Sequence, residues 1–283
     1  LGYLTNSAAR ALKTNRTYNL GVLFVDDAQS GLTHEFFAAV LDSFKRHAES
    51  RGYDITFINH NIGHGHSSYL EHCRYRNCDG VAVLVADNAG AAVQEFVRSG
   101  VPVISVDYHF ENCSCIESDN VGGMQQLVQY IYDQGHRRIA AIFGDDTPVT
   151  RVRMSAFFHT CARLGLEIPE EYVISGVFHE SNSSARATRQ LMALPEPPTC
   201  ILYPDDFSFF GGKRELESMG LSIPEDISAT GYDGISLGKV LRFPLTTNGV
   251  LVDDDVSEWA NRECSNVVLS LDGRKEVHDR FRV

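Results

Sequence analysis

Short apolar runs alternate with amphipathic stretches along almost the whole chain. Residues 20–25, Leu-Gly-Val-Leu-Phe-Val, form the first apolar run, and residues 35–51 then place Phe36, Val40 and Phe44 at helical spacing. The same patterns predict further strands at 53–58, 81–85, 101–106, 139–143, 172–175, 200–203 and 227–231. They predict further helices at 67–76, 91–98, 125–133, 154–164, 184–194 and 212–219. Strand–helix–strand units of this size imply an α/β fold, with parallel sheets covered by helices on both faces.

Glycine follows several of the predicted helices: Gly52, Gly100, Gly135, Gly165 and Gly220. The residue just past a helix often has a left-handed backbone, which glycine adopts without a steric cost. We therefore expect these glycines to end helices.

Charge is distributed unevenly along the 283 residues, a length that suggests two domains or lobes. The 25 Lys and Arg against 37 Asp and Glu give a net charge of −12. Residues 1–17 contain Arg10, Lys13 and Arg16 and no acid, a local +3, so residues 18–283 carry −15. Such a body repels phosphate backbones, and this excludes a protein that coats nucleic acid with its whole surface.

Composition also indicates the compartment. No apolar run is long enough to cross a membrane, and no basic segment is followed by an apolar stretch and a cleavage site. The odd count of seven cysteines favours free thiols over a disulfide framework. We therefore expect a cytoplasmic protein.

Acidic and aromatic residues gather after the predicted strands, where open α/β sheets bind ligands. The acids are Asp26, Asp27, Asp87, Asp107, Asp145, Asp205, Asp206 and Asp233, and the aromatics include Phe36, Phe37, Phe178, Tyr203 and Tyr232. Carboxylates accept hydrogen bonds from neighbouring hydroxyls and aromatic faces cover sugar rings, so the pattern favours a neutral polyol. Two alternatives are ordinary turn aspartates and a Mg²⁺ site, but no Asp-x-Asp pair or phosphate-binding loop supports the latter.

Motifs typical of enzymes are absent from the sequence: it contains no Gly-x-Gly-x-x-Gly, no Walker pattern and no Gly-x-Ser-x-Gly elbow. Histidines and cysteines do cluster, at His60, His64, His66, His72, Cys73 and Cys78. Their spacing matches no standard zinc motif, so incidental surface residues are the favoured interpretation. We expect no catalysis, no cofactor and no metal.

The basic first segment has its own pattern. Asn6 can cap a short helix at 7–13, which is too short to be stable alone in water. Leu12 beside Arg10 and Lys13 is the mixture with which minor-groove binders separate base steps. A cationic linker without a role is the alternative.

Short motifs, which follow one another in a fixed order along the chain, indicate a particular protein family. They are residues 1–12, 15–17, 20–23, Phe36-Phe37, 100–107, Asp119-Asn120, 135–140, 151–157, 231–234 and Pro244-Leu-Thr-Thr247. Together they resemble the lactose/galactose-repressor (LacI/GalR) family of bacterial transcriptional regulators over nearly the whole chain.

The resemblance implies two Rossmann-like lobes joined by three crossovers, near residues 117, 245 and 273, as in periplasmic binding proteins. Residues 18–117 plus 246–273 would form the first lobe, and 118–245 plus 274–283 the second. Residues 1–17 would be a hinge segment that follows a helix-turn-helix missing from this chain. The implied partners are operator DNA, a small effector and a second copy of the chain.

By the same resemblance, the effector contacts are His34, Phe36, Asp107, Arg153, Phe178, Asp205 and Asp233. Arg153 would donate hydrogen bonds to the effector, Asp107 and Asp233 would accept them, and Phe36 and Phe178 would stack on it. A salt bridge for Arg153 and a core position for one of Phe36 and Phe37 are the alternatives. Asn6, Arg10 and Leu12 would contact DNA.

The sequence departs from the family pattern in four places. His34-Glu35 replaces Asn-Pro, Asp205 replaces Asn, Gly234 replaces a second Asp, and residues 248–255 do not align cleanly. The prediction is therefore a DNA-binding regulator that senses a neutral sugar or related metabolite. The alternatives are a solute-binding protein of a transport system and, more remotely, an enzyme on this scaffold.

Overall fold

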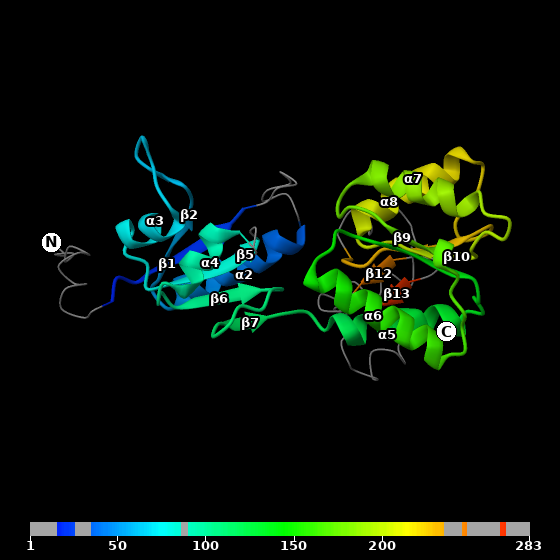
Figure 1. The fold of residues 1–283 in the computed structure, drawn as a ribbon, viewed down its shortest axis with the longest axis horizontal. Coiled ribbons are helices and arrows are strands. Elements are labelled where there is room, and N and C mark those ends of the chain that lie inside the picture. Colours follow the sequence, from blue (N-terminus) through cyan, green and yellow to red (C-terminus); the bar gives the residue numbers. More distant parts are fainter. Residues whose placement is uncertain (1–15, 26–34, 86–89, 235–244, 248–266, 270–283) are drawn as a thin grey trace. The chain divides into compact units, whose positions relative to one another are not determined.

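Two compact units make up the chain in the computed structural model, residues 1–118 and 119–283 (Figure 1). The structure describes residues 16–25, 35–85, 90–234, 245–247 and 267–269. Within these ranges no helix is long and apolar enough to cross a membrane. The six cysteines in these ranges are free thiols, as predicted.

The first unit contains a five-stranded parallel sheet in the order β2-β1-β5-β6-β7. Its strands are β1 (Asn19–Phe24), β2 (Asp54–Ile58), β5 (Gly80–Val85), β6 (Val103–Val106) and β7 (Ser114–Ile116). Its helices are α2 (Glu35–Ser50), α3 (Tyr69–Tyr75) and α4 (Ala91–Arg98), and a small hairpin pairs β3 (Asn61–Ile62) with β4 (Gly65–His66).

Strand alternation decides which helices cover which face of this sheet. Val22 of β1 packs with Phe44 of α2, whereas Leu23, the next residue, packs with Leu70 of α3 and Phe96 of α4. Successive side chains of a strand point to opposite faces, so α2 covers one face and α3 and α4 cover the other.

The second unit repeats this plan with a four-stranded parallel sheet in the order β11-β10-β8-β9. Its strands are β8 (Ile139–Phe143), β9 (Val173–Ser175), β10 (Cys200–Leu202) and β11 (Ser228–Thr230). Its helices are α5 (Asn120–Asp133), α6 (Pro148–Arg163), α7 (Ser181–Met192) and α8 (Asp206–Ser218), with a short 3₁₀ turn η2 (Glu170–Tyr172).

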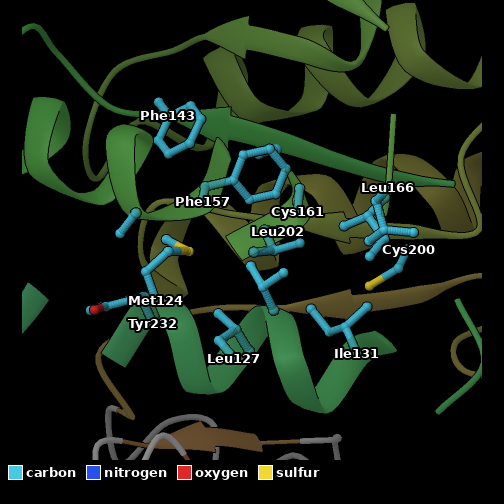
Figure 2. Close-up of a cluster of buried hydrophobic side chains, with 14 residues drawn as sticks. Met124, Leu127, Ile131, Phe143, Phe157, Cys161, Leu166, Cys200, Leu202 and Tyr232 are labelled. Atoms are coloured by element: carbon cyan, nitrogen blue, oxygen red, sulfur yellow. The ribbon is translucent and has the colours of Figure 1, made fainter. Parts of the chain in front are cut away.

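The second-unit core is likewise divided between two faces. Ile139, Ala141 and Phe143 of β8 face α5 and α6, while Ala140 and Ile142 face α7 and α8. Figure 2 shows the first of these clusters, in which Met124, Leu127 and Ile131 line one side of α5. These two apolar clusters cover both faces of the sheet and so fix the positions of the carboxyl ends of its strands.

The predicted strands of both sheets are present with small changes at their ends, and the α/β class is confirmed. Three helices, α5, α6 and α8, begin five or six residues earlier than predicted because their polar caps Asp119, Thr147 and Asp205 precede the first apolar residues. All five predicted helix-ending glycines have positive φ, between 70° and 96°. The hairpin β3–β4 and the edge strand β7 were not predicted.

Two further strands, β12 (Leu245–Thr247) and β13 (Val267–Leu269), pair in parallel outside the two large sheets. The division between the units lies beside the first predicted crossover, but the assignment of 246–273 to the first lobe and of 274–283 to the second stays a prediction. The residues predicted to contact DNA, Asn6, Arg10 and Leu12, and the predicted effector contact His34 lie outside the described residues.

Candidate functional site

Strand order locates the site in the second unit. β8 has β9 on one side and β10 on the other, so the chain reverses its direction of winding between β8 and β10. Loops on either side of such a reversal diverge and leave a crevice at the carboxyl ends of the strands, where α/β sheets bind ligands. Gly144 and Asp145 follow β8 there, and Pro204 and Asp205 follow β10.

Arg153 is the cation at this edge. It projects from the second turn of α6, where its Nε donates a 2.8 Å hydrogen bond to Oδ1 of Asn120 and its Nη1 donates to the carbonyl of Pro204 at 3.2 Å. Its guanidinium lies 3.6 Å from the centre of the Tyr232 ring. Two hydrogen bonds and a cation–π contact fix its orientation, so its alternative assignment to a salt bridge finds no support in these contacts.

Asp233, next to Tyr232, is the acid of the site. Burial is the largest influence on its carboxyl, and the neighbouring carboxylates of Asp206 and Asp205 act in the same direction. Arg153 and His179 oppose them, and the net result raises the pKa of Asp233 to about 7. A carboxyl group with a pKa near neutrality, beside an oriented guanidinium, is typical of a functional site.

Asp205 has a structural role that the resemblance did not predict. Its side chain is 1% exposed and caps α8, accepting hydrogen bonds from the Ser208 amide (2.8 Å), the Ser208 hydroxyl (2.8 Å) and the His179 amide (3.0 Å). Burial acts to raise its pKa, but the hydrogen bonds and charge of His179 outweigh this, and the pKa of Asp205 lies below its ordinary value. The carboxylate thus ties the loop after β9 to the start of α8, and its contact with an effector stays a prediction.

Phe178 forms the apolar wall of the crevice. Its amide donates to Asp145 at 3.0 Å, and its ring lies against Gly144, where any side chain would collide with it. Phe178, Arg153, Pro204 and Tyr232 surround a cavity of about 10 Å³, which has room for about one water molecule. The described residues of the second unit therefore supply an apolar wall, a fixed cation and an acid around a cavity that is too small for a sugar.

Asp107 and Phe36 belong to the first unit. Asp107 follows β6 with φ of 58°, and its Oδ1 accepts a long hydrogen bond, 3.4 Å, from the amide of Ser118. Left-handed backbone outside glycine is uncommon and often marks functional positions. Phe36 packs edge-on to Phe37, which packs edge-on to Phe24 of β1. Phe37 thus joins Phe44 as a ring of α2 that packs against the sheet.

Two residues of the second-unit site, Asn120 and His179, were not predicted, whereas Tyr232 and Asp206 were named only among the aromatics and acids that follow strands. Asn120 and Tyr232 orient Arg153, Asp206 accepts the Tyr232 amide at 2.9 Å, and His179 adopts φ of 57° beside Asp205. Asn120 and Tyr232 do fall within the ordered motifs, which was the available signal. Tyr203, in contrast, is a core residue whose hydroxyl bonds to Thr188 at 2.7 Å.

The histidine–cysteine cluster at 60–78 has local partners. His60 stacks on Tyr69 with ring centres 3.8 Å apart, and the Nδ1 atom of the buried His72 contacts the Asn59 backbone. Among the described residues, the side chains close enough to share a metal ion are a different group, His109, Cys115 and Glu117.

Asp79 holds the start of the described chain. Its carboxylate accepts hydrogen bonds from the Thr17 amide (2.9 and 3.1 Å), the Thr17 hydroxyl (2.8 Å) and the Tyr18 amide (2.9 Å). The predicted hinge segment therefore meets the first unit at a fixed point, just before β1 and β5.

Two doubly wound α/β units in one chain define the class of periplasmic-binding-protein-like domains. Residues 17–268 match the family described as periplasmic binding proteins and sugar binding domain of LacI family. The chain belongs to this family, and the predicted resemblance is confirmed.

Named relatives agree with this assignment. The chain is 31% identical over 254 residues to the ribose operon repressor of Escherichia coli (strain K12), covering 87% of this chain and 74% of the relative. It is 27% identical over 253 residues to the HTH-type transcriptional repressor PurR of Vibrio campbellii, with the same coverage. A regulatory protein of the LacI family from Chloroflexus aggregans has the same fold, with a TM-score of 0.69 at 21% identity over 79% of this chain and 81% of that one. Transcriptional repressors are not enzymes.

Proposed function

We propose that this chain is the effector-binding part of a transcriptional regulator and that its effector is a neutral sugar or a related polyol. The observation that carries the proposal is the oriented pair of Arg153 and Asp233 at the switch point of the second sheet. The relatives named as repressors support the regulatory role.

The charge of the site supports a neutral ligand. Arg153 donates, whereas Asp233 and the buried Asp206 supply carboxylate oxygens that accept from hydroxyls and repel anions. Phe178 offers an apolar ring for the C–H face of a sugar. By resemblance, Phe36 and Asp107 of the first unit add a second ring and a further acceptor, and His34 also contacts the effector.

The regulatory step that we propose involves the segment before residue 17. Effector binding would alter the contact of Asn6, Arg10 and Leu12 with operator DNA, and the two ligands would then change each other's affinity by the same factor. Sequence-specific reading belongs to a helix-turn-helix preceding residue 1, by the same resemblance.

A ligand screen tests the effector site. Thermal-shift measurements over neutral sugars, sugar phosphates and nucleobases identify a ligand, since binding to the folded state alone raises its melting temperature. Arg153→Ala should then weaken calorimetric affinity by about 10- to 150-fold, the equivalent of about 1.5–3 kcal/mol for a charged hydrogen-bond partner. Arg151→Ala is the matched control, because Arg151 is exposed and pairs with Asp146. Equal affinity in the Arg153→Ala variant would remove Arg153 from the site.

A solute-binding protein of a transport system shares this fold and is the second candidate. The coding sequence upstream of residue 1 separates the two, because a regulator requires a helix-turn-helix there and a transport protein requires a signal peptide. A signal peptide would overturn the regulatory proposal and leave the sugar site intact.

We also propose that the regulator is a homodimer that uses the surface between α2 and β2. A groove of about 490 Å³ lies there, on the edge strand of the first sheet, and Phe57 within it is 47% exposed. Lys45 stands in the groove beside the acids Asp42 and Asp54. A two-fold contact places a patch against itself, so a patch with both charges and an exposed ring is self-complementary.

A further inference from the structure

Three side chains of the first unit that are not part of the candidate effector site lie close together. The Nε2 atom of His109 lies 2.9 Å from Oε2 of Glu117, and ligand atoms of His109, Cys115 and Glu117 all lie within 4.8 Å of one another. We propose that these three residues form a binding site for a divalent transition metal, with Zn²⁺ as the ion that best fits them.

The backbone explains why these residues meet. Cys115 lies in β7 and Glu117 directly follows it, so their two-residue spacing along an extended chain places both side chains on one face. β7 pairs in parallel with β6 through a connection of residues 107–113, and His109 lies in that connection. The left-handed backbone of Asp107 turns the chain at the start of this connection. The same turn thus brings an imidazole to a thiol and a carboxylate.

The donor set selects the metal. Thiolate, imidazole and carboxylate are the ligands that zinc takes in proteins, and a thiolate excludes Mg²⁺ and Ca²⁺ as the favoured ions. In a tetrahedral zinc site, neighbouring ligand atoms are about 3.3–3.8 Å apart, given metal–ligand bonds of about 2.0–2.3 Å. The side chains of His109 and Glu117 are exposed, so they have room to rotate toward this geometry. Three protein ligands leave the fourth position for water.

Neighbouring residues of the same types do not join the group. Cys113 packs against the apolar core of the first unit, where burial raises the pKa of its thiol. Glu111 is exposed in the same connection and is outside the cluster. These two residues provide controls of the same residue types at neighbouring positions outside the cluster.

Bound zinc would act as a local clamp. It would join the connection after β6 to the segment that ends at Ser118, where the first unit gives way to the second. Metal binding should therefore raise the melting temperature of the chain, because the ion binds a geometry that the unfolded chain lacks.

The experiment uses the whole chain, stripped of metal with a chelator and titrated with Co²⁺ and Zn²⁺. Co²⁺ should produce a thiolate-to-metal charge-transfer band, and Zn²⁺ should displace it. Cys115→Ser should abolish the band and weaken zinc binding by at least about 10- to 100-fold, whereas Cys113→Ser should keep both. Glu117→Gln should weaken binding, and Glu111→Gln should not.

His109→Ala provides a readout that does not depend on the thiol, and the exposure of His109 keeps the folded state intact. Zinc should raise the melting temperature of the unsubstituted chain and leave that of His109→Ala unchanged. A charge-transfer band that persists in Cys115→Ser, or the absence of any band in the unsubstituted chain, would overturn the proposal. Loss of sugar binding in the Arg153→Ala variant bears on the effector site only and is independent of these outcomes.

Discussion

Asp233 combines a structural cost with the binding role that we propose for it. Its pKa of about 7 results first from burial and then from Asp206, with Arg153 opposing both. An unfolded aspartate titrates near 4. Between about pH 4 and pH 7, the folded chain therefore binds a proton on Asp233 that the unfolded chain does not bind.

A pH dependence of stability follows from this difference. The contribution of Asp233 to stability is fully present below about pH 4 and is lost as the pH rises through about 7, where the buried carboxyl becomes charged. Asp233→Asn should therefore unfold at a higher temperature than the unsubstituted chain at pH 8, by about 2–4 °C for an effect on the order of 1 kcal/mol. At pH 5 the two should differ much less.

The exposed Glu225 offers a control, since Glu225→Gln should show no such pH-dependent gain. Differential scanning calorimetry at the two pH values measures both variants. An equal gain for Asp233→Asn at pH 5 and pH 8 would contradict the titration of this carboxyl and attribute the gain to packing.

Helix starts are the element-scale feature that sequence patterns locate least well. Apolar periodicity begins only after the first turn of α5, α6 and α8, whereas the helices themselves begin at their caps Asp119, Thr147 and Asp205. A capping residue is polar and accepts hydrogen bonds from backbone amides in the first turn of the helix. It therefore does not contribute to the apolar periodicity from which a helix is predicted. β7 was missed for a related reason, because Ser114-Cys-Ile116 is too short to show alternation.

The caps differ in how much they stabilise. Asp205 is buried and serves both α8 and the loop at His179, whereas Thr147 is half-buried and caps α6 through the Thr150 amide at 3.1 Å. Asp205→Ala should cost about 2–4 kcal/mol in urea unfolding, because it removes a cap and leaves buried donors without acceptors. Thr147→Ala should cost about 0.5–2 kcal/mol. Equal losses would show that Asp205 acts as a cap alone.

Helix ends were predicted more accurately, and Gly165 shows why. Its φ of 70° needs a residue without a side-chain penalty, and a Cβ placed there would have no neighbour within 4 Å. Gly165→Ala should therefore cost only about 1 kcal/mol, through the backbone. Gly211→Ala should cost more, since its Cβ would collide with the Ser181 backbone at the start of α7. Urea unfolding of both variants tests this order.

At the scale of the whole molecule, the proposed dimer interface makes a further prediction. Phe57→Asp places a charge in the α2–β2 groove, where two copies would bury it, and should shift the chain to monomer in sedimentation velocity. Tyr75→Asp is the control, because Tyr75 is 61% exposed on α3, outside the groove. Dimers that persist in Phe57→Asp would contradict the assigned surface.

The fold could be predicted because short apolar runs mark nearly every strand of the two sheets. The site could be predicted in part: Arg153, Phe178 and Asp233 lie together in the second unit, as the resemblance implied. Asn120 and His179 could not be assigned, since their roles depend on hydrogen bonds across 33 and 26 residues of sequence. The net positive charge of residues 1–17 likewise gives no indication that Asp79 accepts hydrogen bonds from Thr17.

Asp79 provides a test of the proposed coupling between effector binding and operator binding. Asp79→Ala removes the carboxylate that accepts hydrogen bonds from Thr17 and Tyr18, and leaves the bond from the Thr17 hydroxyl to the Asn77 carbonyl in place. In a fusion to a DNA-binding helix-turn-helix, this variant should keep its effector affinity but lose most of the effector's influence on operator affinity. Glu95→Ala, at an exposed position of α4 in the same unit, is the control. Unchanged coupling in Asp79→Ala would show that the signal passes elsewhere.

The attachment at Asp79 also has a mechanical consequence. Thr17 joins the first unit at the amino ends of its strands, whereas Asp107 lies beyond the carboxyl end of β6. The six residues of β1 span about 20 Å, and a sheet packed on both faces turns as a stiff plate. In the regulator that we propose, a small rotation of this sheet at the Asp107 end would therefore displace the segment attached at the other end. The first unit would act as a lever arm, with Asp79 at its far end.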